Sequence, residues 1–146
     1  MALVISVITT SKIGVWNIPM RGQNFINNYY ANINNYKLGK VFSKGLLFNN
    51  YDLLQSIIKK KNKKKIVIIF CSALQLLVVK KNKNNFINFF KKYEIHFSLE
   101  LKKGKGAKFL NQTFKELSYF TRQKNINMKN IKKYKDLFET YKNKIV

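Results

Sequence analysis

Apolar positions along the chain form runs of two kinds, some continuous and others repeating every three to four residues. The continuous runs are rich in β-branched residues and are typical of strands buried on both faces, as in a parallel sheet covered by helices. They occupy Leu3–Thr9, Ile66–Ser72 and Ile95–Glu100, with a shorter run at Lys37–Ser43. We expect the rest of the sheet to assemble around the central run, Ile66–Ser72.

Segments with helical periodicity separate these runs. Apolar side chains recur at helical spacing over Gln23–Asn34, over a second helix that Asn49 can cap, and over a third that ends at Lys91 and Lys92. The apolar segment Ala73–Val79 is ambiguous between a loop and a helix start. Two further helices are expected later in the chain, at Ala107–Thr121 and Met128–Lys142.

Strands alternating with helices predict βαβ units, whose crossover connection is almost always right-handed. We therefore expect the α/β class, with a small four-stranded, mainly parallel sheet, helices on both faces and a basic helical C-terminal tail. A single α/β domain would span residues 1–123, and the tail would span residues 124–146. The glycine- and lysine-rich segment Leu101–Lys108 is expected to be a turn.

The composition indicates a folded protein. With 46% hydrophobic and 14% aromatic residues, the chain is too apolar to be disordered. Its longest mostly apolar span, Ile66–Val79, contains Ser72 and Gln75 and is shorter than the roughly 20 residues of a membrane helix. No secretory signal is evident at Met1–Ile8. We therefore expect a soluble, cytoplasmic protein without a membrane span.

The net charge of +23 favours an anionic partner, with nucleic acid first. However, only Arg21 and Arg122 are arginine, the residue whose planar fork clamps phosphate and reads guanine. Lysine, asparagine and isoleucine share A/T-rich codons, so an AT-rich genome would also place lysine on solvated surfaces. Both interpretations of the charge, a polyanion-binding surface and a codon bias, stay open.

One cysteine and one histidine restrict metal and redox chemistry. Cys71 lies in the central apolar run, where we expect a small buried thiol rather than a nucleophile. A structural zinc site takes four Cys or His ligands, so we expect no metal. The glycine fingerprints of dinucleotide and P-loop sites are absent, so no cofactor is indicated either.

Candidate ligand-binding residues follow the ends of the predicted strands, where α/β sheets place their ligands. The loop after the first strand contains Ser11, a candidate nucleophile or hydroxyl donor, and Arg21, which could clamp a carboxylate or phosphate. Gln23 and Asn24 open the first helix, and they either hydrogen-bond a ligand or satisfy the loop backbone.

Further candidates lie on the third and fourth strands. Ser72 ends the central run, and His96 is either a packed, hydrogen-bonded imidazole or a general base. Glu100 ends the fourth strand and is a better functional candidate than any lysine, although the turn Lys102–Gly106 could hold a phosphate. The catalytic candidates are Ser11, His96 and Glu100, and the ligand-binding candidates are Ser11, Arg21, Gln23, Asn24, Ser72 and Glu100.

Two segments resemble those of a known family. The segment Ile18–Asn24 (IPMRGQN), followed after four residues by a tyrosine pair, resembles the I-P-x-R-x-Q-N segment of the sporadic carbohydrate cluster protein family. The segment Glu94–Glu100 (EIHFSLE) resembles that family's E-I-H-F-A-L-E segment. This resemblance implies a small protein of surface-carbohydrate biosynthesis, of the lipopolysaccharide or capsule type. The family's conserved polar positions would correspond to Ser11, Lys12, Gln23, Asn24 and Glu100.

The order of elements is also similar to that of the serine recombinase catalytic domain. The arginines that activate the nucleophile there are missing here, so we do not expect DNA cleavage. The leading hypothesis is a cytoplasmic protein, enzyme or accessory subunit, that binds or modifies a sugar or sugar-phosphate at the carboxyl ends of the strands. The alternatives are a basic nucleic-acid-binding protein, such as an organellar ribosomal component whose lysine-rich tail contacts the polyanion, and a structural partner whose exposed Phe and Tyr stripes pack against another chain.

Overall fold

The computed structural model of the protein describes residues 2–10, 12–14, 16–42, 51–62 and 65–119. The chain forms two compact units, Met1–Phe114 and Lys115–Val146. The elements follow in the order β1 (Leu3–Val7), α1 (Met20–Ile33), β2 (Lys40–Phe42), α2 (Asp52–Lys61), β3 (Ile66–Phe70), the 3₁₀ helix η1 (Ala73–Asn82), α3 (Lys83–Phe90), β4 (Glu94–Phe97) and β5 (Lys102–Lys105). Residues 107–119 form a further helix.

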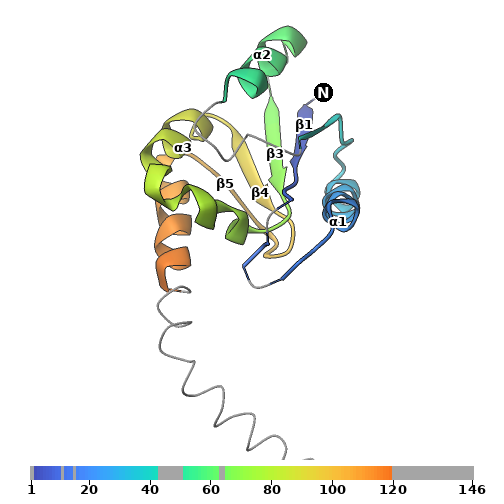
Figure 1. Ribbon diagram of the computed structural model, residues 1–146. Helices are drawn as coiled ribbons and strands as arrows, with labels where there is room; N and C mark the ends of the chain where they lie inside the picture. Colours follow the sequence, from blue (N-terminus) through green and yellow to red (C-terminus); the bar gives the residue numbers. More distant parts are fainter. Residues whose placement is uncertain (1, 11, 15, 43–50, 63–64, 120–146) are drawn as a thin grey trace, which may run out of the picture. The chain divides into compact units, whose positions relative to one another are not determined.

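The strands form one sheet in the order β2-β1-β3-β4-β5. The first four strands are parallel, and β5 runs antiparallel to β4. The predicted α/β class with a mainly parallel sheet of four strands is therefore confirmed, and β5 extends this sheet at one edge. The register pairs Val7 with Phe70 and Phe70 with Phe97, so the carboxyl ends of β1, β3 and β4 meet at the same edge (Figure 1).

The prediction that Leu101–Lys108 is a turn was wrong for its central part, because Lys102–Lys105 forms β5. Lysine has a low strand propensity, but it is common on edge strands because its charge blocks pairing with another sheet. Gly104 lies in this strand because a side chain would not fit. A Cβ at this position would lie 2.3 Å from Cδ2 of Phe109, which packs against the strand.

Helices cover both faces of the sheet, as predicted. On one face α1 packs Tyr30 and Ala31 against Val4, Val67 and Ile69, all of which are buried. Successive strand residues point to opposite faces, so these alternating positions on β1 and β3 identify the face that α1 covers. Figure 1 shows α1 on one side of the strands and α3 on the other.

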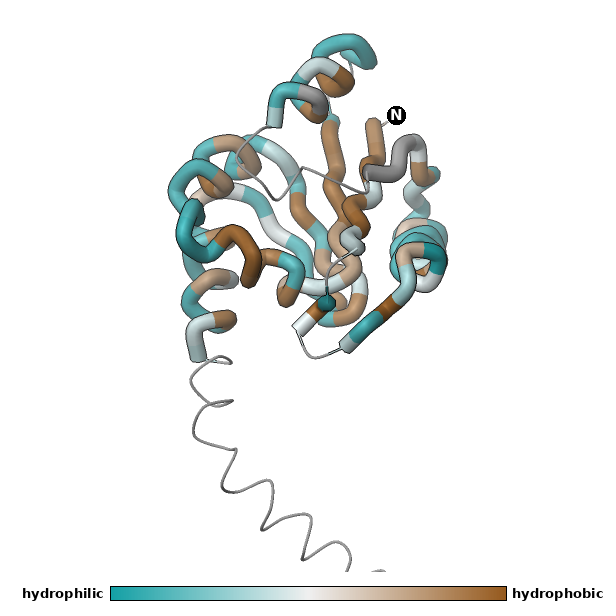
Figure 2. The backbone as a smooth tube through the Cα atoms, viewed as in Figure 1, coloured by the Kyte–Doolittle hydropathy of each residue, from teal (hydrophilic) through white to brown (hydrophobic). Residues whose placement is uncertain are grey.

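The opposite face is an aromatic core. Phe70 of β3 lies 6.1 Å from Phe86 and 6.0 Å from Phe90 of α3, measured between ring centroids. Phe97 of β4 lies 5.8 Å from Phe70, and all four rings are fully buried. Burial of each such ring is worth about 1.5–3 kcal/mol, so this cluster holds α3 to the sheet. Figure 2 shows the corresponding concentration of hydrophobic residues along the strands.

The structure confirms four of the predicted helices, namely α1, α2, α3 and the helix over residues 107–119, with shifted ends. The first begins at Met20 rather than Gln23. The ambiguous segment after β3 begins η1, where Ser72 Oγ accepts the N–H of Leu74 and Gln75 Oε1 accepts the N–H of Ser72. Three predicted features lie outside the described residues, namely the Asn49 cap, the helix Met128–Lys142 and the domain boundary at 123/124. Within the described residues, no helix has the length and apolar character needed to cross a bilayer.

Candidate functional site

Gln23 lies at the carboxyl edge of the sheet, but its hydrogen bonds are made to the backbone. Its Oε1 accepts the N–H of Thr9 at 2.8 Å, and its Nε2 donates to the carbonyls of Thr9 at 2.8 Å and Ile18 at 2.7 Å. The side chain is fully buried, so it fastens the first turn of α1 to the end of β1. On the same turn Arg21 is exposed, and Asn24 has a buried Oδ1 that lacks a hydrogen-bond partner within the described structure.

Ser72 and Glu100 meet at the same edge of the sheet. Ser72 Oγ donates a hydrogen bond to Glu100 Oε1 at 2.5 Å, and the same oxygen accepts the N–H of Ala73 at 3.2 Å. Gln75 joins this group to β1, because its Nε2 donates to the carbonyl of Val7 at 3.2 Å. The predicted site residues on α1, just after β3 and in the β4–β5 connection are thus brought to one edge. The prediction that Glu100 ends the fourth strand was wrong, because β4 ends at Phe97 and Glu100 lies in the connection after it.

Of the two reactive side chains that the sequence singled out, Ser11 and Cys71, the structure describes Cys71. Ser11 lies outside the described residues, and its role stays a prediction. Cys71, by contrast, is fully buried as expected. Burial and the nearby negative charge of Glu100 raise the pKa of the Cys71 thiol to about 11, which makes it a poor nucleophile at neutral pH.

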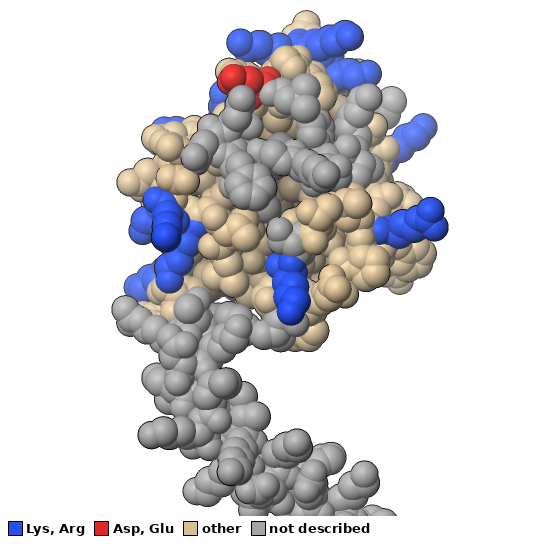
Figure 3. Space-filling model, viewed as in Figure 1, with Lys and Arg blue, Asp and Glu red and all other residues tan. Residues whose placement is uncertain are grey.

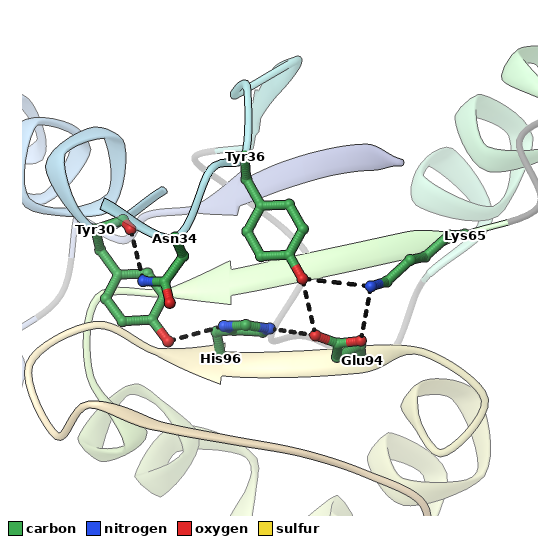
Figure 4. A network of polar contacts seen from close by, with 6 residues as sticks. All are labelled: Tyr30, Asn34, Tyr36, Lys65, Glu94 and His96. Atoms are coloured by element: carbon green, nitrogen blue, oxygen red, sulfur yellow. Dashed lines mark hydrogen bonds and ion pairs between the residues drawn. The ribbon is translucent and has the colours of Figure 1, made fainter. Parts of the chain in front are cut away.

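His96 lies on β4, facing α1, and is fully buried between Tyr30 and Glu94 (Figure 4). Its Nε2 is 2.7 Å from Glu94 Oε1, and its Nδ1 is 2.8 Å from the hydroxyl of Tyr30. A carboxylate only accepts hydrogen bonds, so Nε2 carries a proton, and in the neutral imidazole Nδ1 accepts from the Tyr30 hydroxyl. His96 is therefore packed and hydrogen-bonded, and a role as general base stays a prediction.

Glu94 is the junction of this polar network. Its Oε1 also accepts a hydrogen bond from the Tyr36 hydroxyl at 3.2 Å, and its Oε2 lies 3.4 Å from Lys65 Nζ. Burial by itself raises the pKa of Glu94, but the hydrogen bond from His96 and the positive charge of Lys65 outweigh this effect and lower the pKa. Lys65 Nζ also donates to the Tyr36 hydroxyl at 3.3 Å.

The same contacts also shift the pKa of Lys65. The hydrogen bond with Tyr36, followed by the negative charge of Glu94, raises the pKa of Lys65 above its usual value. Lys65 and Glu94 therefore both keep their charges across the neutral pH range. Figure 4 shows that they lie at one end of the network, whose other end is the buried Tyr30.

A cavity of about 400 Å³ adjoins Glu94 at the amino ends of β3 and β4. Its volume is in the range of small-molecule sites, which are about 300–1,000 Å³. Lysines from three separate segments surround it, and its apolar wall is formed by two isoleucines and a tyrosine. We call this cavity the lysine pocket, and its lining residues are Ile58, Lys65, Ile66, Lys92, Tyr93, Glu94 and Lys105.

The positions of two pocket lysines, Lys92 and Lys105, follow from their contacts with neighbouring residues. Lys92 Nζ lies 5.4 Å from the ring centroid of Tyr93 and 5.9 Å from that of Phe89, at distances typical of cation–π interactions. Lys105 enters the pocket through the antiparallel register of β5, which pairs it with Glu94. The pocket therefore depends on the one strand that sequence reasoning missed.

Sequence reasoning located the candidate site at the carboxyl edge, whereas the lysine pocket lies at the amino edge. The sequence did contain a partial signal for the contact between Glu94 and His96. These residues are two positions apart and therefore share one face of their strand. The contributions of Lys65 and Lys105 depend on strand pairing, which no local motif indicates. Among the described residues, no cluster of three or more His, Cys, Asp or Glu side chains could hold a metal ion.

No protein-family model, no curated protein and no solved structure matches this chain. The resemblance to sporadic carbohydrate cluster proteins therefore stays a prediction.

Proposed function

We propose that this protein binds a small phosphorylated molecule of the sugar-phosphate class in the lysine pocket. The observation that carries the proposal is the placement of three lysines, from separate segments, around a cavity of about 400 Å³. The resemblance to proteins encoded among surface-polysaccharide genes supports the sugar part of the proposal. The predicted site at the carboxyl edge is the competing location for the same ligand.

The cations suit a phosphate monoester. Lysine binds phosphate as a compact point charge, and three lysines can surround an anion without requiring the paired geometry of arginine. The contacts with Tyr36 and Glu94 raise the pKa of Lys65, so this side chain is a cation across the neutral pH range. Lys92 and Lys105 line the pocket and are exposed to solvent, so they can attract the ligand.

Glu94 favours a phosphorylated sugar over phosphate alone. A carboxylate near a phosphate repels it, and a hydrogen-bond donor on the ligand offsets this repulsion. Sugar hydroxyls are such donors, and the side chain of Glu94 is 25% exposed and lines the cavity. The apolar wall of Ile58, Ile66 and Tyr93 suits the C–H face of a sugar ring.

Isothermal titration calorimetry of the full chain with a hexose 6-phosphate and with inorganic phosphate tests this proposal. We expect the hexose phosphate to bind more tightly than inorganic phosphate. Substitutions Lys92→Gln and Lys105→Gln should each weaken hexose phosphate binding about tenfold, which corresponds to about 1.4 kcal/mol. Substitution Glu94→Gln should strengthen binding of inorganic phosphate and reduce the preference for the sugar.

Substitution Lys81→Gln is the matched control, because it removes the same charge from an exposed lysine that does not line the pocket. Its affinity for the hexose phosphate should equal that of the unsubstituted protein. Equal weakening by Lys81→Gln would show that only net charge matters, and absence of binding would contradict the proposal outright.

A second candidate function, nucleic-acid binding, is favoured by the net charge of +23. Binding to a polyanion releases counterions, so its affinity falls steeply as salt rises. Titration of a single-stranded RNA at several salt concentrations separates the two functions. Nucleic-acid binding predicts a steep salt dependence that Lys81→Gln and Lys92→Gln change equally, whereas the pocket predicts a shallow dependence for the hexose phosphate.

A further inference from the structure

The outer face of α1 exposes large apolar side chains. Phe25, Tyr29 and Ile33 are 71%, 63% and 57% exposed. They are spaced four residues apart, so they lie in a line along one side of the helix. The opposite side of α1 is already buried against the sheet through residues such as Tyr30 and Ala31. We call the three exposed residues the α1 stripe.

The α1 stripe lies in an uncharged stretch of a highly charged protein. No Asp, Glu, Lys or Arg occurs from Gly22 to Tyr36, although 24% of all residues are charged and the net charge is +23. Arg21 is the one charged residue within α1. The polar residues beside the stripe on its exposed side are the neutral Asn28 and Asn32.

We propose that the α1 stripe pairs with the α1 stripe of a second copy of this chain about a twofold axis. In a twofold interface, residues near the axis face their own counterparts, so a charged residue there would face a like charge. The uncharged stretch avoids this repulsion in a protein whose copies otherwise repel one another. A nucleic acid, an anionic membrane or an acidic protein would instead favour Lys or Arg beside the aromatic rings.

The size of the stripe indicates a weak dimer. A helix of 14 residues is about 21 Å long, and a fully buried aromatic side chain contributes about 150–250 Å². Two partly exposed rings and one isoleucine therefore supply less than the roughly 800 Å² that each partner buries in a standard stable interface. Association should depend on concentration. It should also strengthen with salt, because salt screens the repulsion between the two cationic copies.

Sedimentation velocity of the full chain over a range of protein and salt concentrations tests this proposal. We expect a monomer–dimer equilibrium in which the dimer fraction rises with both concentrations. The double substitution Phe25→Lys and Tyr29→Lys should abolish the dimer, because it places like charges opposite each other. Circular dichroism establishes that this variant is folded, and Tyr29→Ser, which removes one ring and should weaken the dimer, replaces it if it is not.

The control variant also gains two lysines, but at exposed apolar positions outside α1. Val78 and Leu99 are exposed apolar residues, 47% and 48% accessible, outside α1. The double substitution Val78→Lys and Leu99→Lys should leave the dimer fraction close to that of the unsubstituted protein. A protein that is monomeric at every concentration would overturn the proposal, as would a dimer that survives loss of the stripe or is lost equally in the control.

Discussion

The contacts of Glu94 come from three parts of the chain. His96 lies two residues along the same strand, Tyr36 follows α1, and Lys65 precedes β3. The local sequence therefore accounts for the His96 contact alone, and the fold provides the other two. The lowered pKa of Glu94 is therefore a property of the folded state, with a consequence for the pH dependence of stability.

Glu94 should stabilise the protein above pH 4.5 and lose this effect in acid. Its pKa is lowered on folding from a usual value of 4.5, so the folded state favours the charged form. The resulting stability is present above the unfolded pKa and disappears as pH falls through the lowered pKa. We expect Glu94→Gln to have a lower free energy of unfolding than the unsubstituted protein at pH 7, with the difference shrinking at pH 3. Urea unfolding at both pH values measures this, and a difference independent of pH would contradict it.

Cys71 should be nearly unreactive in the folded protein. Burial, followed by the charge of Glu100, raises its pKa from 9.0 to about 11, so little thiolate is present at neutral pH. We expect a disulfide reagent at pH 8 to label it on the order of a hundredfold more slowly in the native protein than in denaturant. The raised pKa also predicts that stability falls as pH rises from 9 towards 11. Equal labelling rates in the two states would show that the thiol is accessible.

At the scale of elements, α1 is fixed to the sheet by a buried polar contact as well as by its apolar residues. Asn27 Nδ2 donates to Ser6 Oγ on β1 at 2.8 Å, and Asn27 Oδ1 accepts from Ser98 Oγ, just after β4, at 2.8 Å. All three side chains are buried. This contact fixes the position of α1 along the strands, because both hydroxyls lose a partner if α1 shifts.

Substitution Asn27→Ala should destabilise the protein by about 2–4 kcal/mol. It removes the partner of two buried hydroxyls, and each buried polar group left unsatisfied costs about 1–3 kcal/mol. Substitution Asn28→Ala, on the exposed side of the same helix, is the control and should change the free energy of unfolding by less than about 0.5 kcal/mol. Denaturant unfolding compares the two variants, and similar losses would contradict a specific role for the buried contact of Asn27.

Substitution Gly104→Ala should destabilise the β4–β5 hairpin by about 1–3 kcal/mol, the usual cost of overpacking. An added Cβ would lie 2.3 Å from Cδ2 of Phe109, so either the ring or the strand must move. Substitution Gly22→Ala in α1 is the control, since its Cβ would meet Ile18 Cγ2 at an acceptable 3.4 Å and alanine favours helix. Thermal unfolding measures both, and a neutral Gly104→Ala would show that this packing is not tight.

The sequence predicted the elements better than their contacts. Continuous β-branched runs identified β1 and β3, and helical periodicity identified α1, because these signals depend on local residue order. The strand Lys102–Lys105 was missed because three lysines and a glycine have low strand propensity, and only pairing with β4 and packing of Phe109 explain it. For the same reason, the sequence did not indicate that Lys105 lines the pocket.

At the scale of the whole molecule, the positive charge of the described residues can be followed on one face. On the face shown in Figure 3, Lys and Arg side chains lie at many separate places among the coloured residues. A spread of this kind fits both a solvated lysine-rich surface and nonspecific attraction of anions. The lysine pocket differs from this background because its three cations converge on a cavity.

The location of the candidate site could not be derived from sequence at this scale. The fold class correctly indicated that Gln23 and Glu100 belong to the carboxyl edge of the sheet, since parallel strands end together. It could not indicate that Gln23 would be fully used by backbone groups, nor that a cavity would form at the opposite edge. Both depend on how loops and side chains pack after the sheet has formed.

The most direct test of the central claim is a ¹H–¹⁵N NMR titration of the full chain with a hexose 6-phosphate. The amide signals report which edge of the sheet the ligand contacts. We predict saturable shifts at Lys65, Lys92, Glu94 and Lys105, with little change at Ser72 and Glu100. Shifts confined to Ser72, Glu100 and the start of α1, or no saturable shifts at all, would contradict a phosphate site in the lysine pocket.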